Sequence, residues 1–137
     1  MNCQISAGFL SFSRIGKTRL VGGSAHNEGR LEVLVGDEVG TVCDDGWGME
    51  EAEVACRQLG FPGAIRATSG GWFGSGTGPI LLDDVVCTGH EAQLTSCRYT
   101  DGSRHNCNHN EDAGVVCQNN STLCSLSSFS FNAMAAW

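Results

Sequence analysis

Polar and apolar residues first alternate in the segment Arg30–Val35, which has the sequence Arg-Leu-Glu-Val-Leu-Val. This two-residue period is typical of a β-strand with one buried face. Gly36-Asp37 is then a favoured reverse-turn pair, and Val39–Cys43 continues as a second β-type run. The pattern therefore predicts a β-hairpin, which ends where a loop begins at Asp44-Asp45-Gly46.

The period changes to that of a helix in the segment Glu50–Leu59. Ala52, Cys56 and Leu59 are spaced i, i+4 and i+7, which places them on one face. Acidic residues crowd the first turns, where the helix dipole favours negative charge, and Gly60 ends the helix. Because Cys56 lies on the apolar face, we expect its disulfide partner to come from the sheet beneath the helix.

The rest of the chain has weaker patterning. The glycine- and serine-rich segment 63–78 predicts a long ordered loop, and the segment 99–112 is polar and irregular. Short β-type runs lie on both sides of Asp83-Asp84, and residues 113–117 form a last strand. Residues 91–97 have the pattern of a brief second helical turn.

These elements predict an α+β fold. We expect a small disulfide-stabilised domain in which a curved antiparallel sheet of short strands cradles one main helix, together with a short second helix. The domain is expected to span residues 18–118. Residues 1–17 form a poorly defined N-terminal flank, and residues 119–137 form a C-terminal flank that we expect to be disordered.

Composition and charge narrow the class of protein. The net charge of −7 argues against general nucleic-acid binding, which needs a basic surface. No stretch is long and apolar enough to cross a bilayer, so we expect no direct membrane insertion by this segment. The first seventeen residues make a poor signal peptide, and we expect any export signal to lie upstream.

Cysteine usage points to an extracellular domain held by three disulfides. The chain has eight cysteines, and six can pair in fifteen ways, among which the sequence does not choose. The six inside the predicted domain are Cys43, Cys56, Cys87, Cys97, Cys107 and Cys117.

A set of motifs between residues 19 and 117 matches one known family in register. The motifs are Arg19–Gly23, Glu28–Val33, Gly40–Asp45, Ala55–Phe61, Gly78–Val85 and Glu111–Cys117. On these residues the chain resembles a scavenger receptor cysteine-rich domain.

The resemblance also implies a subtype and a disulfide scheme. Family members with eight cysteines carry an extra pair where this chain has Asn27 and Phe61, so the chain resembles the six-cysteine group A type. The implied pairings are Cys43–Cys107, Cys56–Cys117 and Cys87–Cys97. Cys3 and Cys124 lie outside this scheme.

Two cation sites follow from the same resemblance. Bonding of Cys43 to Cys107 would bring neighbouring acids together, and hard oxygen ligands suit Ca²⁺. Some relatives bind Ca²⁺ with matching residues, which implies Asp44, Asp45 and Glu111 as ligands. A second site would use Asp83 and Asn106, with Glu51 as a weaker candidate. The alternative is that these acids are solvated or paired with arginine.

The resemblance implies a ligand-binding module rather than an enzyme. Its expected partners are extracellular proteins, polyanions or microbial surfaces, held with the help of Ca²⁺, and Arg98 and Arg104 are the expected ligand contacts. The chain lacks the catalytic motifs of hydrolases and closely spaced zinc ligands. Two alternatives stay open: an accessory domain of a larger secreted enzyme, and a structural spacer in a multidomain receptor.

Modification of the C-terminal flank is also expected. Asn119-Asn120-Ser121-Thr122 contains two overlapping N-glycosylation sequons, at Asn119 and Asn120. They follow the last cysteine of the predicted domain, where an exported chain is open to glycosylation.

Overall fold

The computed structural model describes residues 17–101 and 106–119. In this part of the chain, seven strands form one sheet around a single α-helix, α2 (Met49–Gln58). Two 3-10 turns, Leu94–Ser96 and His109–Glu111, complete the regular structure. The strands are β1 (Lys17–Gly22), β2 (Glu28–Val35), β3 (Glu38–Val42), β4 (Ala64–Thr68), β5 (Ile80–Val86), β6 (Arg98–Asp101) and β7 (Gly114–Cys117).

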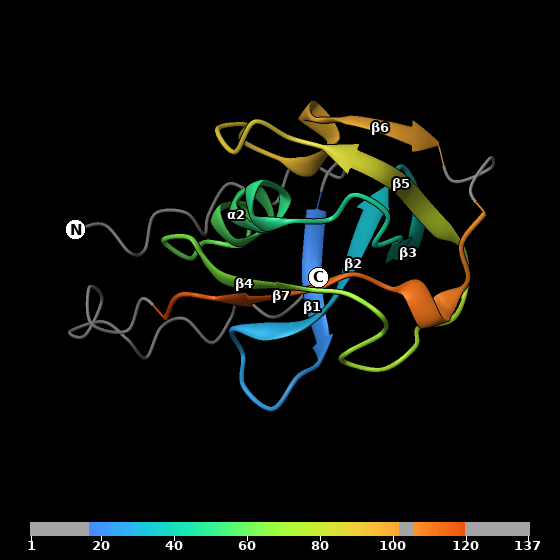
Figure 1. Ribbon diagram of the computed structural model, residues 1–137, viewed down its shortest axis with the longest axis horizontal. Coiled ribbons are helices and arrows are strands. Elements are labelled where there is room, and N and C mark those ends of the chain that lie inside the picture. The colour runs from blue at the N-terminus through green and yellow to red at the C-terminus, as the bar shows by residue number, and fades with distance from the viewer. Residues whose placement is uncertain (1–16, 102–105, 120–137) are drawn as a thin grey trace.

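The sheet has the order β4-β7-β2-β3-β5-β6, and β1 lies along the other edge of β2 (Figure 1). The first half of β2 pairs with β7 and its second half with β3. Every pairing is antiparallel except that of β3 with β5, which is parallel. The expected antiparallel sheet therefore has one exception. Its cause is the long connection through α2 and β4, which returns the chain to the sheet in the same direction.

The predicted hairpin is present as β2 and β3. Leu31 and Val33 point into the core from β2, between residues that are only partly buried. At the turn, Gly36 has a positive φ of 64°, a conformation that glycine adopts without steric cost. The alternating strand pattern and the turn at Gly36-Asp37 thus produce the hairpin that the sequence predicts.

Helix α2 begins and ends one residue before its predicted bounds. At its start the Gly48 amide donates to Glu51 Oε1 at 2.9 Å, and the Cys87 amide donates to Glu51 Oε2 at 2.8 Å. Glu51 is 5% exposed; the first bond caps the helix, and the second joins the helix to the residue that follows β5. At the C-terminal end, Gly60 has a φ of 100°, as expected for a residue that ends a helix.

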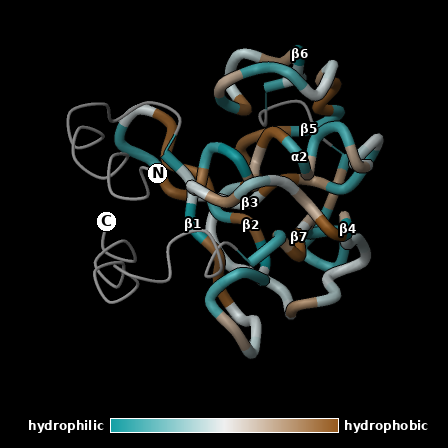
Figure 2. Tube along the Cα trace, turned by 90° about the vertical axis from the view of Figure 1, so that its left-hand side faces the viewer, coloured by the Kyte–Doolittle hydropathy of each residue, from teal (hydrophilic) through white to brown (hydrophobic). Residues whose placement is uncertain are grey.

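The core lies between α2 and the inner face of the sheet. It contains the fully buried side chains of Leu31, Val54, Leu82 and Val115, contributed by four different elements. Figure 2 shows how hydrophobic and hydrophilic segments alternate along the tube, as expected for short elements with one buried face each.

Several predictions for the weakly patterned segments were wrong in detail. The segment 63–78 is not all loop, because β4 (Ala64–Thr68) pairs with β7. The two β-type runs around Asp83-Asp84 form the single strand β5, whose pairing with β6 shifts register between Asp83 and Val86. The irregular segment 99–112 contains most of β6 and the turn His109–Glu111. By contrast, the brief second helical turn predicted within residues 91–97 is confirmed as the 3-10 turn Leu94–Ser96.

Three disulfides tie these elements together, and they are the pairings that the family resemblance implies. Cys43–Cys107 joins the end of β3 to the segment before the turn His109–Glu111. Cys56–Cys117 joins α2 to β7, so the helical cysteine is bonded to the sheet beneath it. Cys87–Cys97 closes the loop between β5 and β6. Cys3 and Cys124 lie outside the described residues.

Candidate functional site

Three carboxylates meet where the chain leaves β3. Asp44 and Asp45 follow Cys43 directly, and Glu111 belongs to the turn His109–Glu111. One carboxylate oxygen from each acid lies within 4.8 Å of one from each of the others. The structure therefore brings together the three residues of the first predicted cation site, which we call the acid cluster.

Backbone pairing produces this arrangement together with the disulfide. Cys43 forms an isolated antiparallel bridge with Asp112. The Asp44 amide donates to the Glu111 carbonyl at 2.8 Å, and the Ala113 amide donates to the Val42 carbonyl at 2.8 Å. The segment that follows β3 therefore runs beside residues 111–113, and this places Asp44 next to Glu111, which is 67 positions away in sequence.

The donor set of the acid cluster fits a hard divalent cation. None of the three acids forms an ion pair with a described residue, so no described arginine or lysine offsets their mutual repulsion. Asp44 Oδ2 accepts the Gly70 amide at 2.6 Å, and Glu111 Oε1 accepts the Asn108 amide at 3.0 Å. These bonds orient the carboxylates and leave further lone pairs on each.

A second group of oxygens surrounds the Cys43–Cys107 disulfide. Asp45 Oδ2, Asp83 Oδ1 and Asn106 Oδ1 lie 3.6, 3.5 and 3.7 Å from Cys107 Sγ, respectively. These are contacts rather than hydrogen bonds, because a disulfide sulfur carries no proton. The residues predicted for the second cation site therefore lie next to Asp45 of the first. Glu51 does not join them, because its carboxylate caps α2.

A family model describes this architecture. The model for the scavenger receptor cysteine-rich (SRCR) domain matches residues 21–118 of the chain. The chain belongs to this family. Known members of the family are extracellular receptor-type modules that bind ligands outside the cell. No helix in the described ranges has both the length and the apolarity needed to cross a membrane.

Two solved SRCR domains are similar to this one. The third SRCR domain of murine neurotrypsin is 51% identical, with a TM-score of 0.70 over 75% of this chain and 96% of that one. The SRCR domain of mouse MARCO, crystallised in a dimeric form, is 43% identical, with a TM-score of 0.62 over 82% of this chain and all of that one. Both likenesses support the SRCR fold.

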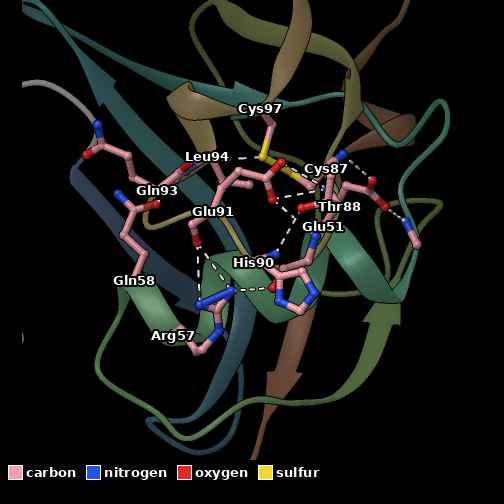
Figure 3. The surroundings of a disulfide bond; sticks show 12 residues. Glu51, Arg57, Gln58, Cys87, Thr88, His90, Glu91, Gln93, Leu94 and Cys97 are labelled. Carbon is pink, nitrogen blue, oxygen red and sulfur yellow. Dashed lines mark hydrogen bonds between the residues drawn. A yellow bond between two sulfur atoms is a disulfide. The ribbon is translucent and has the colours of Figure 1, made fainter.

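The Cys87–Cys97 loop of this SRCR domain is held by the end of α2 (Figure 3). Arg57 donates to the backbone carbonyls of Gly89 and Glu91. The Glu91 carboxylate accepts the Thr88 amide at 2.9 and 3.0 Å and the Gly89 amide at 3.1 Å. Hydrogen bonding to the Thr88 amide is the main reason why the pKa of Glu91 falls to about 2. Arg57 and Glu91 therefore stabilise the loop.

Glu28 also has a shifted pKa, and its carboxyl too acts within a loop. Glu28 Oε2 accepts the Ser24 amide at 3.0 Å and the Ser24 hydroxyl at 2.8 Å. The bond from the Ser24 amide is the main cause of the lowered pKa of Glu28. This acid lies at the start of β2 and belongs to neither oxygen group.

Two of the predicted ligand contacts and modification sites lie among the described residues. Arg98 is an exposed residue of β6, at one edge of the sheet. Asn119 is exposed two residues after the last cysteine of the domain. Arg104 and Asn120 lie outside the described residues.

One surface pair was missed by the sequence reasoning. The guanidinium of Arg66 lies 5.9 Å from the ring centroid of Trp72, and both side chains are exposed. The sequence gives no local indication of this contact, because the two residues belong to β4 and to the turn after it.

Proposed function

We propose that this SRCR domain is an extracellular ligand-binding module whose acid cluster holds Ca²⁺. One observation carries the proposal: three carboxylates with no described counter-ion lie within 4.8 Å of one another. Oxygen ligands of this kind are those that Ca²⁺ prefers. When bound, the cation would offset the repulsion among the acids and offer open coordination positions to an anionic ligand.

A second Ca²⁺ site is proposed at Asp83 and Asn106, adjacent to the first through Asp45. Its support is the placement of three oxygens within 3.7 Å of a single sulfur atom. The two cysteines in this group are bonded to each other and are not available as ligands.

The proposed partners are extracellular proteins or polyanionic surfaces, including microbial ones, and we propose binding rather than catalysis as the role. Arg98, and with it Arg104, remains a proposed contact for the anionic groups of such ligands. Asn119 and Asn120 are proposed glycosylation sites, and the exposure of Asn119 supports this.

The six-cysteine subtype is supported by the residues at the positions of the extra pair. The Asn27 carbonyl accepts the Cys117 amide at 2.7 Å, and Asn27 Nδ2 donates to the Cys117 carbonyl at 2.8 Å. Phe61 packs against His26, with 5.7 Å between ring centroids. The ring contact thus joins the two segments that a fourth disulfide would join, and the hydrogen bonds hold Asn27 to the end of β7.

The alternative of a domain within a larger protein also has support. The neurotrypsin structure is of the third SRCR domain of that protein, so a similar domain occurs there as one of several. An accessory or spacer role in a larger receptor or secreted enzyme is the corresponding second proposal for this chain.

Calorimetric titration with Ca²⁺ tests the first proposal. We expect saturable binding by the wild-type chain, and a loss of at least tenfold in affinity for Asp44→Asn and for Glu111→Gln, because each removes one charged ligand. Asp37→Asn is the matched control, since Asp37 is an exposed acid of the β2–β3 turn. Equal Ca²⁺ affinity in all four chains would contradict the proposal.

A further inference from the structure

Trp72 has the most exposed side chain among the large hydrophobic residues in the described part of the chain, at 64%. A single exposed apolar residue is common on protein surfaces and needs no explanation. Two other features distinguish Trp72: the turn that carries it is tightly hydrogen-bonded, and a cationic side chain lies over its ring.

The turn around Trp72 is held by its own backbone and by the acid cluster. The Trp72 amide donates to the Ser69 carbonyl at 3.2 Å, and the Gly74 amide donates to the Gly71 carbonyl at 2.8 Å. The Gly70 amide donates to Asp44 Oδ2 at 2.6 Å. The indole therefore projects from an ordered segment, and this lowers the conformational entropy that is lost when a partner binds.

Arg66 supplies a positive charge that no described acid neutralises. Arg19 and Arg30 both pair with Glu32, whereas the Arg66 guanidinium lies 5.9 Å from the centroid of the Trp72 ring. This distance is within the range of a cation–π interaction. The guanidinium keeps its planar set of donors, which matches a carboxylate bidentately.

A register shift exposes the neighbour of Arg66 as well. The pairing of β4 with β7 passes from Ala64 to Arg66 and omits Ile65. In a regular strand one of two successive side chains points inward, but here Ile65 and Arg66 are both exposed, Ile65 by 58%. Irregularities of this kind re-aim side chains and are frequent next to functional sites.

We propose that Ile65, Arg66 and Trp72 form a docking surface for a protein partner that presents an acidic side chain beside an apolar one. This docking patch rests on the proposed ligand-binding function and adds the class of partner. Trp and Arg are the residues most enriched at protein-interface hot spots. The aliphatic side chain of Ile65 favours a protein over a glycan, because sugar hydroxyls packed against it would lose hydrogen bonds.

Selection from a library of random peptides displayed on phage tests this proposal. The wild-type chain alone is the target, and the variants are used only afterwards, in the binding measurements. We expect enriched peptides to combine Asp or Glu with an adjacent apolar residue. Synthetic copies should bind the Trp72→Ala chain about 30-fold more weakly than wild type, as is typical of a hot spot. Arg66→Gln should weaken binding similarly, and Arg66→Lys should restore only part of it.

Two matched variants control for general surface effects. Val86→Ala removes an apolar side chain that is 54% exposed on β5, and Lys17→Gln removes a positive charge on β1. Both should bind the selected peptides as the wild type does. All variants should keep the wild-type thermal midpoint, because none of the replaced side chains is buried.

The proposal is overturned if the selected peptides bind the Trp72→Ala and Arg66→Gln chains as tightly as wild type, or if no peptide is enriched. It is also overturned if only heparin oligosaccharides, tested in parallel, lose binding in these variants, since the patch would then be a glycan site. Ca²⁺ titration of the same chains tests the acid cluster separately. Failure of the docking patch therefore does not affect the test of the Ca²⁺ site.

Discussion

The Cys43–Cys107 disulfide is expected to support both the fold and the acid cluster, and replacing it by Cys43→Ala/Cys107→Ala separates the two effects. The bond closes a loop of 64 residues, and chain entropy gives such a cross-link about 4 kcal/mol of stability. That is a large part of the roughly 5–15 kcal/mol that stabilises a typical domain. The same change leaves Glu111 held beside Asp44 and Asp45 by backbone pairing alone, which we expect to loosen the acid cluster.

Cys87→Ala/Cys97→Ala provides the matched control. Its loop spans only 10 residues, so the same entropy model predicts a smaller loss of about 3 kcal/mol. This loop carries no member of the acid cluster. We therefore expect it to lose stability while keeping wild-type Ca²⁺ affinity, whereas Cys43→Ala/Cys107→Ala loses both.

Urea denaturation followed by circular dichroism measures the two stability losses, and calorimetry measures Ca²⁺ affinity under conditions in which each variant is folded. The reasoning is refuted if folded Cys43→Ala/Cys107→Ala chain binds Ca²⁺ as tightly as wild type. It is also refuted if the control variant loses Ca²⁺ binding to the same extent. In either case the disulfide would not be what assembles the site.

Two further predictions concern stability away from the acid cluster. Folding lowers the pKa of Glu91 from 4.5 to about 2, so the stability from its hydrogen bonds is fully present above pH 4.5 and is lost as the pH falls toward 2. Glu91→Gln should remove this part of the pH dependence of stability in urea denaturation. An unchanged pH profile would contradict the assignment. In the second prediction, Trp47 Nε1 donates to the Gly114 carbonyl at 3.0 Å. Trp47→Phe should therefore lower the free energy of unfolding by about 1–3 kcal/mol, because the partly buried carbonyl loses its donor. A thermal midpoint equal to that of wild type would show that water replaces the bond.

The elements predicted correctly from the sequence are those whose evidence is local. The hairpin follows from alternation in Arg30–Val35 and from the turn at Gly36, and α2 follows from the stripe of Ala52, Cys56 and Leu59. In each case the residues that decide the structure lie within a few positions of one another. The bounds of α2 shift by one residue because Glu51 caps the helix from inside its first turn.

The elements that were missed depend on distant partners. β4 has a five-residue sequence inside a glycine-rich segment, and it is a strand because β7 lies beside it. The parallel pairing of β3 with β5 likewise depends on a long crossover. No local pattern reports such pairings, because their hydrogen bonds join residues that are remote in sequence.

The candidate site shows the same division. The family resemblance and the disulfide that it implies identified the acid cluster of Asp44, Asp45 and Glu111. The disulfide states which distant residues lie close together, and composition does not contain this information. Arg66 and Trp72 were not linked, since their contact arises from a strand register and a turn that only the structure shows.

Diffraction from a crystal of the wild-type chain grown with Ca²⁺ tests the central claim most directly. The anomalous signal of the ion locates it without reference to any assumed ligand. The structure predicts a peak among the carboxylate oxygens of Asp44, Asp45 and Glu111. A Ca²⁺ peak elsewhere on the domain, with none at these three acids, would contradict the account.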